Sequence, residues 1–271
     1  MPSELDGWPA LLLVPRGPEP SAPNDGAKVT DSQDPEQVPA DVLTEMRRYY
    51  SDRAPEFEEW VYRRGRYSLG DGGNARWRYE YAEVTSAFDR LRLAGDVLEL
   101  AAGTGIWTKR LVLTARSVVA LDASPEMIAI NRGFVANVRV EYRIQDLFEW
   151  EPDGEYDALV MTYWLSHVPR ERLDTFLVKC ARALKPNGIC FVADGILGRG
   201  KSAGLQEPTK NPQVVVRRLQ DGRTYRIVRN SLDPNELTRS FERVGIRMEI
   251  TETPTHFLYG TGTRVARNGE G

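Results

Sequence analysis

The sequence predicts an α/β protein built on a seven-stranded, mostly parallel sheet with helices on both faces. Three observations lead to this prediction. Short apolar runs alternate with segments of helical period from residue 96 onward, which is typical of parallel strands joined by crossover helices. A Gly-Thr-Gly turn directly follows the first run. The last two runs, 247–253 and 256–265, are separated by only a short break, which predicts an antiparallel last strand.

Composition narrows the class of protein. The chain has 271 residues, of which 41% are hydrophobic and 28% charged, enough for one domain with additions. A net charge of −3 gives no bulk reason to expect nucleic acid or a membrane as partner. Cys180 and Cys190 lie in apolar patterns, so we interpret them as reduced core residues of a cytoplasmic protein. With only two histidines, a His-rich metal site is excluded and no metal is expected.

The N-terminal third precedes the predicted sheet. Residues 1–39 are rich in Pro, Ser, Asp and Gly and are expected to form a disordered tail. Residues 40–73 are expected to form a helical lid, ending in a Gly-rich break at 70–74 where Asn74 caps the next helix. From Trp77 onward, apolar residues recur at helical spacing, so the main domain is expected to span 74–266.

Seven strands follow, interrupted by one insertion. The segment 173–184 has one apolar face and ends at the KPNG turn, as expected of a helix before the fifth strand. Within the insertion, residues 196–230, two apolar runs flank an Asp-Gly turn and predict a β-hairpin near the substrate pocket. The strand candidates are 96–100, 117–123, 138–145, 156–164, 188–195, 247–253 and 256–265.

The candidate ligand-binding residues lie at the ends of the predicted strands. Residues 97–108, VLELAAGTGIWT, place a glycine turn after a strand, and the next strand ends in Asp122, 17 positions after Gly105. Glycines let a ligand approach the backbone, and an acid at this place can accept from a ribose diol. The dinucleotide-binding fingerprint requires a third glycine at position 108, but this chain has Thr108. A second acid follows the third strand in QDLF, residues 145–148.

In combination, these motifs resemble those of the class I S-adenosylmethionine-dependent methyltransferases. ELAAGTG matches their first motif, LDASPEM the second, QDLF the third and LKPNG the turn before the fifth strand, over roughly residues 41–266. MRRYYSDRAPEFEEW, YWLSHVP and RRLQDGRTYRIV are similar to small-molecule enzymes of actinobacterial natural-product pathways, such as the teleocidin C- and lincosamide N-methyltransferases. The resemblance implies a Rossmann-like fold and methylation of a secondary-metabolite intermediate, at carbon or nitrogen rather than oxygen. Phe57 departs from relatives that often have Tyr.

The resemblance also implies a cofactor site. Asp122, with Ala123 beside it, would bind the ribose hydroxyls, and Met127 would pack on the adenine. Asp146 would accept from the adenine amine while the Leu147 amide donates to a ring nitrogen. The methionine and ribose end would be lined by Glu99, Ala101, Gly103 and Gly105.

Five aromatic or imidazole side chains are acceptor-side candidates. His167 follows the fourth strand and is the leading candidate for a general base, the alternative being a histidine that only shapes the pocket. Tyr50 and Trp164 could stabilise positive charge, as could Tyr49, although the tyrosines could equally be helix packing. His256 opens the last strand and is a weaker candidate, with a structural role favoured.

Two other functions stay open from the sequence. One is an NAD-dependent enzyme on a similar sheet, and the other is a non-catalytic S-adenosylmethionine-binding protein. We expect a small-molecule substrate, with the lid and the insertion walling its pocket. We also expect a homo-oligomer formed through the N-terminal helices.

Overall fold

The computed structural model describes residues 37–197 and 206–266. The predicted tail therefore lies outside the described residues up to residue 36. Val38, which the sequence assigns to that tail, is only 7% exposed. Its amide donates to Glu171 Oε1 at 3.0 Å. The described chain thus starts on a packed segment that leads straight into the first helix.

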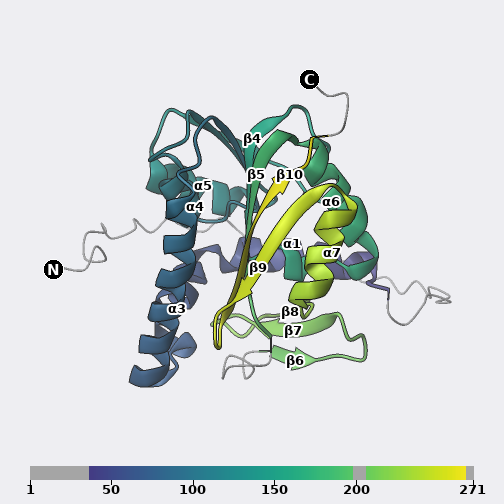
Figure 1. Cartoon of the computed structure of the whole chain (residues 1–271). Helices are drawn as coiled ribbons and strands as arrows, with labels where there is room; N and C mark the ends of the chain where they lie inside the picture. Colours follow the sequence, from purple (N-terminus) through teal and green to yellow (C-terminus); the bar gives the residue numbers. More distant parts are fainter. Residues whose placement is uncertain (1–36, 198–205, 267–271) are drawn as a thin grey trace. The chain divides into compact units, whose positions relative to one another are not determined.

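The seven-stranded sheet is confirmed, in the order β3-β2-β1-β4-β5-β10-β9. Strands β1 to β5 run parallel to one another, and β10 is antiparallel to both β5 and β9 (Figure 1). The central strands are almost continuous runs of buried Val, Leu, Ala and Met because helices cover both faces. The bounds are β1 Asp96–Leu100, β2 Ser117–Asp122, β3 Val140–Ile144, β4 Tyr156–Thr162, β5 Leu184–Gly195, β9 Ile246–Glu252 and β10 Phe257–Arg264.

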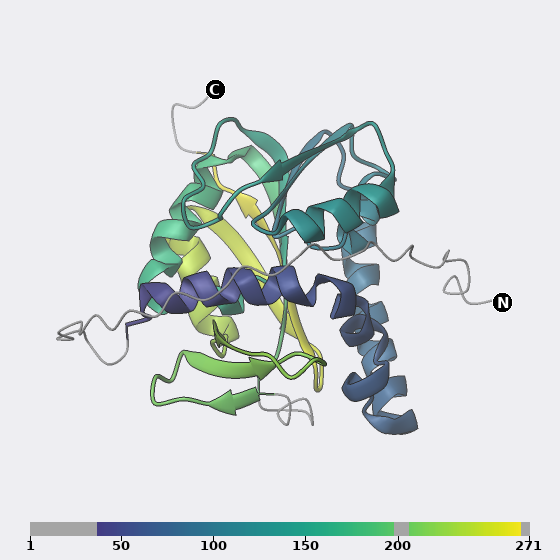
Figure 2. The ribbon, with the colours of Figure 1, turned by 180° about the vertical axis from the view of Figure 1, so that it is seen from behind.

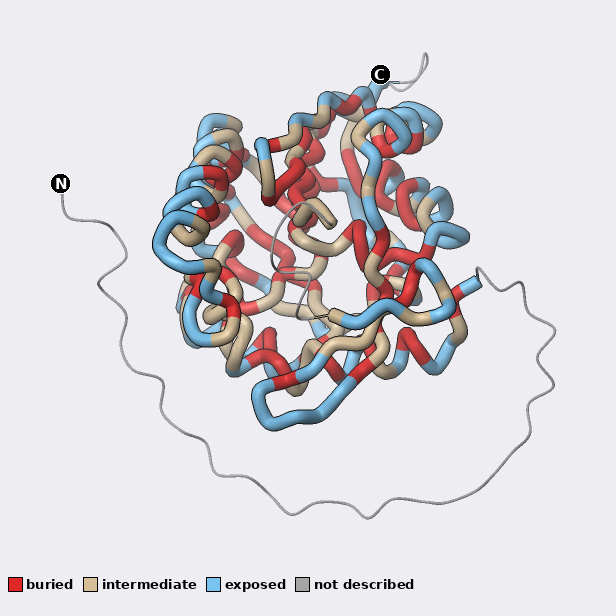
Figure 3. Tube along the Cα trace, turned by 90° about the horizontal axis from the view of Figure 1, so that it is seen from below, coloured by how far each residue is buried: buried red, intermediate tan, exposed pale blue. Residues whose placement is uncertain are grey.

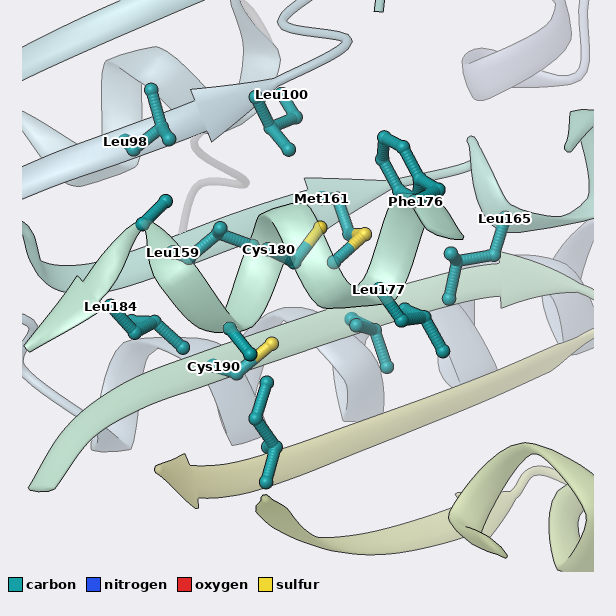
Figure 4. Packing of buried hydrophobic residues seen from close by; sticks show 14 of the residues in the cluster. Leu98, Leu100, Leu159, Met161, Leu165, Phe176, Leu177, Cys180, Leu184 and Cys190 are labelled. Atoms are coloured by element: carbon teal, nitrogen blue, oxygen red, sulfur yellow. The ribbon is translucent and has the colours of Figure 1, made fainter. Parts of the chain in front are cut away.

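Helices pack on the sheet in two groups, each with its own hydrophobic cluster. On one face lie α3 Gly70–Arg90, α4 Ile106–Leu111 and α5 Pro125–Val135, and on the other lie α6 Arg170–Arg182 and α7 Pro234–Arg243. Figure 4 shows the second cluster, where Phe176, Leu177 and Cys180 of α6 meet the strands. Cys180 and Cys190 are both buried and free. Figure 3 colours each residue by its burial, with the exposed residues of the described chain toward the outside and the buried ones toward the interior.

Helix α3 begins earlier than predicted. The Gly-rich segment 70–74 forms its first turn, so the expected break lies inside the helix and Asn74 is no N-cap. Instead, Asn74 Oδ1 accepts from the Leu69 amide at 2.9 Å, which satisfies a donor at the helix entrance. The glycines cost helix propensity of about 1 kcal/mol each, which the buried face around Trp77 outweighs.

A smaller unit covers the carboxyl edge of the sheet. Helix α1 Ala40–Arg53 packs on a hairpin of β7 Val214–Arg218 and β8 Thr224–Val228, with β6 Gln206–Pro208 completing a second sheet. We call α1 and this hairpin the cap. Figure 2 shows α1 between the hairpin and α5, both of which it contacts. After α1 the chain continues through η1 Ala54–Glu56, α2 Phe57–Tyr62 and η2 Gly65–Tyr67.

The cap has a hydrophobic cluster of its own. It joins Leu43 and Met46 of α1 to Ile227 and Val228 of the hairpin. At its rim Arg226 pairs with two acids of α1, Asp41 at 2.8 Å and Glu45 at 2.6 Å. The predicted hairpin is therefore confirmed, and its partner is the N-terminal helix.

Among the described residues, no helix combines the length and apolar character needed to cross a membrane.

Candidate active site

One cavity lies between the carboxyl ends of the parallel strands and the cap. Its empty volume is about 1030 Å³, open solvent at the mouth included. The floor comes from the turns after β1, β2, β3 and β4, and the roof comes from α1, α2 and the hairpin. Ligands of open α/β sheets bind at this edge, so we build the site from here.

The turn after β1 is shaped by left-handed backbone. Ala101 has φ 56° and Gly103 has φ 53°, and both line the cavity. Gly105 has φ 95°, and a Cβ there would come within 2.5 Å of Asn131 Oδ1. Gly105 therefore lets the turn close against α5 and does not itself line the cavity. A left-handed alanine costs of order 1 kcal/mol or more, a strain typical of functional sites.

Asp122 ends β2 and faces the cavity with its orientation fixed. One carboxylate oxygen accepts from the Gly103 amide at 2.8 Å, and the other accepts from the Ser124 amide at 2.9 Å. Burial raises the pKa of Asp122, while these amides oppose the shift. Each oxygen keeps a second lone pair, so the carboxylate can still accept from a vicinal diol. Ala123 and Met127 line the cavity beside it.

The second acid, Asp146, follows β3 and is already engaged. One of its oxygens accepts from the Phe148 amide at 3.0 Å, and the other pairs with Arg47 of α1. Leu147 lines the same end of the cavity. A ligand amine that hydrogen-bonds to Asp146 must therefore share its carboxylate with Arg47 of the cap.

Glu99 lies behind the site. It is 2% exposed and accepts from Thr108 Oγ1 at 2.6 Å. Burial raises its pKa to about 8, and the negative charge of Asp122 acts in the same direction. Glu99 supports the turn after β1 from below and does not line the cavity.

At the other end of the cavity, Tyr50 and His167 form a hydrogen-bonded pair. His167 Nδ1 lies 2.6 Å from the Val228 carbonyl, which can only accept, so Nδ1 carries the proton. Nε2 then accepts from the Tyr50 hydroxyl at 2.8 Å. Burial, and after it the Arg229 guanidinium, lower the pKa of His167 to about 3. Burial raises the pKa of Tyr50 to about 12, so both side chains are neutral at pH 7.

Aromatic side chains form the wall between these two ends. Trp60 and Trp164 line the cavity, as does Tyr163, which has φ 57° at the end of β4. Trp164 packs on Phe148 with ring centroids 5.3 Å apart. Its indole Nε1 is buried without a hydrogen-bond partner.

The structure gathers most of the predicted site residues and separates four from the cavity. Besides Glu99 and Gly105, Tyr49 does not line it, because its ring is 1% exposed inside the cap. His256 packs on Trp77 at 5.0 Å and lies outside the cavity lining. The predictions that line the cavity are Ala101, Gly103, Asp122, Ala123, Met127, Asp146, Leu147, Tyr50, Trp164 and His167.

The sequence patterns predicted two acids of the cavity but none of its other charged residues. Arg47, Arg53, Arg217 and Arg229 all line it, with Asp194 near the end of β5. Arg217 lies in the hairpin and Arg229 directly follows it, where an arginine usually points to solvent, so the pattern alone gave no signal. Among the described residues, no group of three His, Cys, Asp or Glu is placed to hold a metal ion.

The strand order, the glycine turn after β1 and the acids after β2 and β3 define a class I S-adenosylmethionine-dependent methyltransferase. A family model described as a methyltransferase domain matches residues 97–188. The DhpI–SAH complex is similar over 85% of this chain and 100% of that one, with 33% identity and a TM-score of 0.67. The DhpI–SAM–HEP complex has 35% identity and a TM-score of 0.66, over 83% of this chain and 99% of that chain. The chain belongs to this methyltransferase family.

A curated relative extends the comparison. The ubiquinone biosynthesis O-methyltransferase of Xylella fastidiosa (strain 9a5c) is 31% identical over 166 residues. The match covers 59% of this chain and 64% of the relative, so the chain spans less than two thirds of that protein.

Proposed function

We propose that this protein transfers the methyl group of S-adenosylmethionine to a small-molecule acceptor. The observation that carries the proposal is a single cavity joining the acids after β2 and β3 to the Tyr50–His167 pair. One end offers carboxylates for a nucleoside, and the other offers a polar pair beside aromatic walls. The bound cofactor would supply an already activated methyl group on its sulfonium.

The cofactor end offers groups that suit a nucleoside. Asp122, held by two backbone amides, would accept from both ribose hydroxyls. Met127 would pack against the adenine, and Asp146 would accept from its amine once Arg47 shares or releases the carboxylate. The left-handed turn at Ala101 and Gly103 would let the backbone approach the methionine part closely.

At the acceptor end, His167 would act through Tyr50. The Nε2 atom is occupied by the Tyr50 hydroxyl, so a proton from the acceptor would pass to Tyr50 while Tyr50 gives its own to His167. A neutral imidazole with a lowered pKa resists holding that proton, so the pair assists only as the methyl bond forms. Alignment of donor and acceptor in a water-poor cavity would supply the rest of the rate enhancement.

Finer parts of the proposal rest on the sequence resemblance. They are a secondary-metabolite acceptor, methylation at carbon or nitrogen rather than oxygen, a cytoplasmic location and a homo-oligomer formed through the N-terminal helices. The buried free cysteines support the location. The name of the Xylella relative, an O-methyltransferase, keeps oxygen among the atoms to test.

Calorimetry with the full chain tests the proposal. S-adenosylmethionine and S-adenosylhomocysteine should bind at one site per chain, and NAD should not. A panel of small acceptors should then convert donor to S-adenosylhomocysteine. Binding of NAD alone would establish the dinucleotide alternative, and donor binding without turnover on any acceptor would establish a non-catalytic binding protein.

A further inference from the structure

Arg53 is a buried cation without a carboxylate partner among the described residues. It ends α1, is 4% exposed and lines the cavity. Its guanidinium carbon lies 5.6 Å from the ring centroid of Tyr49, 5.2 Å from that of Phe57 and 5.6 Å from that of Tyr67. Its Nε and Nη2 atoms are buried with no hydrogen-bond partner. Aromatic faces stabilise such a cation but leave its N–H donors unused.

Arg217 of β7 likewise has no carboxylate partner among the described residues, although its side chain is half-buried rather than buried. Its Nη2 donates to the amide oxygen of Gln206 at 2.9 Å, and its Nε is buried without a partner. Burial lowers its pKa, and the guanidinium groups of Arg53 and Arg229 push in the same direction. These cations are therefore close enough to repel one another inside the cavity.

Two other arginines near the site, in contrast, form ion pairs with carboxylates. Arg229 lies 3.0 Å from Asp194, a carboxylate that is only 1% exposed and also accepts from Ser166. Arg226, on the outer rim of the cap, pairs with two acids. The acceptor end of the cavity thus holds the guanidinium groups of Arg53, Arg217 and Arg229 against one carboxylate, Asp194. The remaining acids of the cavity, Asp122 and Asp146, belong to the nucleoside end.

Unpaired cations in a buried cavity are costly unless an anion completes them. We infer that the methyl acceptor carries a carboxylate or phosphate group, and that Arg217 and Arg53 bind this group beside Tyr50. Guanidinium forks match such oxyanions with two parallel hydrogen bonds, and the free Nε atoms supply the missing donors. This inference rests on the proposed function and names the chemical class of its acceptor.

The carboxylate of the methyl donor is a competing occupant, and position argues against it for Arg217. Arg217 lies on β7 of the hairpin and lines the cavity from its roof, whereas the turn after β1 is part of the floor. The donor's methionine part would instead follow the turn at Ala101 and Gly103 after β1. The test is therefore made on protein already saturated with S-adenosylhomocysteine, whose own carboxylate is then in place.

The experiment titrates two probes, inorganic phosphate and succinate, into the saturated full chain by calorimetry, with succinamide as the uncharged control. We expect millimolar binding of at least one anion and none of succinamide. Arg217→Gln should weaken anion binding by about tenfold or more, and Arg217→Lys should restore part of it. Arg218→Gln, at the exposed neighbour on the same strand, should match the wild type. Arg53→Gln is the second test variant.

Three results would overturn the inference. These are no binding of either anion at tens of millimolar, displacement of S-adenosylhomocysteine by the anion, or equal anion affinity in wild type and Arg217→Gln. The affinity of each variant for S-adenosylhomocysteine shows that it is folded. If the wild type itself does not bind S-adenosylhomocysteine, the proposed function is contradicted. Failure of the anion site is thereby distinguished from failure of the proposed function.

Discussion

Replacing Asp122 by Asn tests the nucleoside end of the site with the least change in shape. The carboxylate accepts from the Gly103 and Ser124 amides, one on each oxygen. An asparagine has only one oxygen, so one of these amides would face an NH₂ group and lose its acceptor. The same NH₂ group would also replace one of the two acceptors that we assign to the ribose diol.

The two losses act on different quantities. The lost ribose hydrogen bond should cost about 1–3 kcal/mol of binding free energy. That corresponds to a dissociation constant for S-adenosylhomocysteine raised roughly 5- to 150-fold. The lost backbone contact is made in the free protein too, so it lowers the free energy of unfolding rather than the affinity.

Calorimetry with S-adenosylhomocysteine at pH 7.5 measures the change, and thermal unfolding of the free protein checks folding. Asp174→Asn is the matched control, because Asp174 is an exposed acid that pairs with Arg243 at 2.8 Å on the outer helices. It should bind like the wild type. An Asp122→Asn protein that is folded and binds within threefold of the wild type would refute the ribose assignment.

Three further outcomes are expected. Tyr50→Phe and His167→Ala should each lower kcat by about 10²-fold with little change in cofactor affinity, measured with a turnover assay on the identified acceptor; wild-type kcat in both would remove the proton route. Because the folded pKa of Glu99 is raised to about 8, its neutral form stabilises the fold at low pH and this contribution is lost as pH rises from about 4.5 through 8. In urea unfolding, roughly 5 kcal/mol of this pH dependence should disappear in Glu99→Gln, and an unchanged pH dependence of the free energy of unfolding would contradict the raised pKa. A chain starting at residue 37 should keep turnover, while one starting at residue 63 should lose it together with α1; equal activity of both would show that the cap is dispensable.

The sequence predicted the sheet and the cofactor end because both depend on local patterns. Buried parallel strands are continuous apolar runs, and the glycine turn must follow a strand directly, so VLELAAGTG fixes both at once. Asp122 ends β2 and Asp146 follows β3, and both could be placed because the carboxyl ends of parallel strands lie at the same edge of the sheet. Gly105 and Glu99 belong to the same motif, yet they support the turn from behind rather than line the cavity.

The acceptor end could not be predicted in the same way. It is made where α1 meets a hairpin more than 160 residues later in the chain, and no local period encodes that meeting. The Tyr50–His167 contact and the cluster of Arg53 with Arg217 arise only from this packing. For His256, by contrast, the sequence favoured a structural role, and its ring packs on Trp77 outside the cavity lining.

The separate hydrophobic cluster of the cap has a consequence for how such an enzyme can change over time. Residues of α1 and the hairpin pack mainly on each other, whereas the nucleoside end is built from turns anchored in the sheet. Substitutions within the cap that keep Arg47, the partner of Asp146, should therefore change which acceptor is methylated while the proposed recognition of the donor stays intact. To redirect the enzyme to a new acceptor, α1 and its hairpin should therefore be exchanged together between related chains. Exchanging only one of them would combine residues from two different proteins in one hydrophobic cluster.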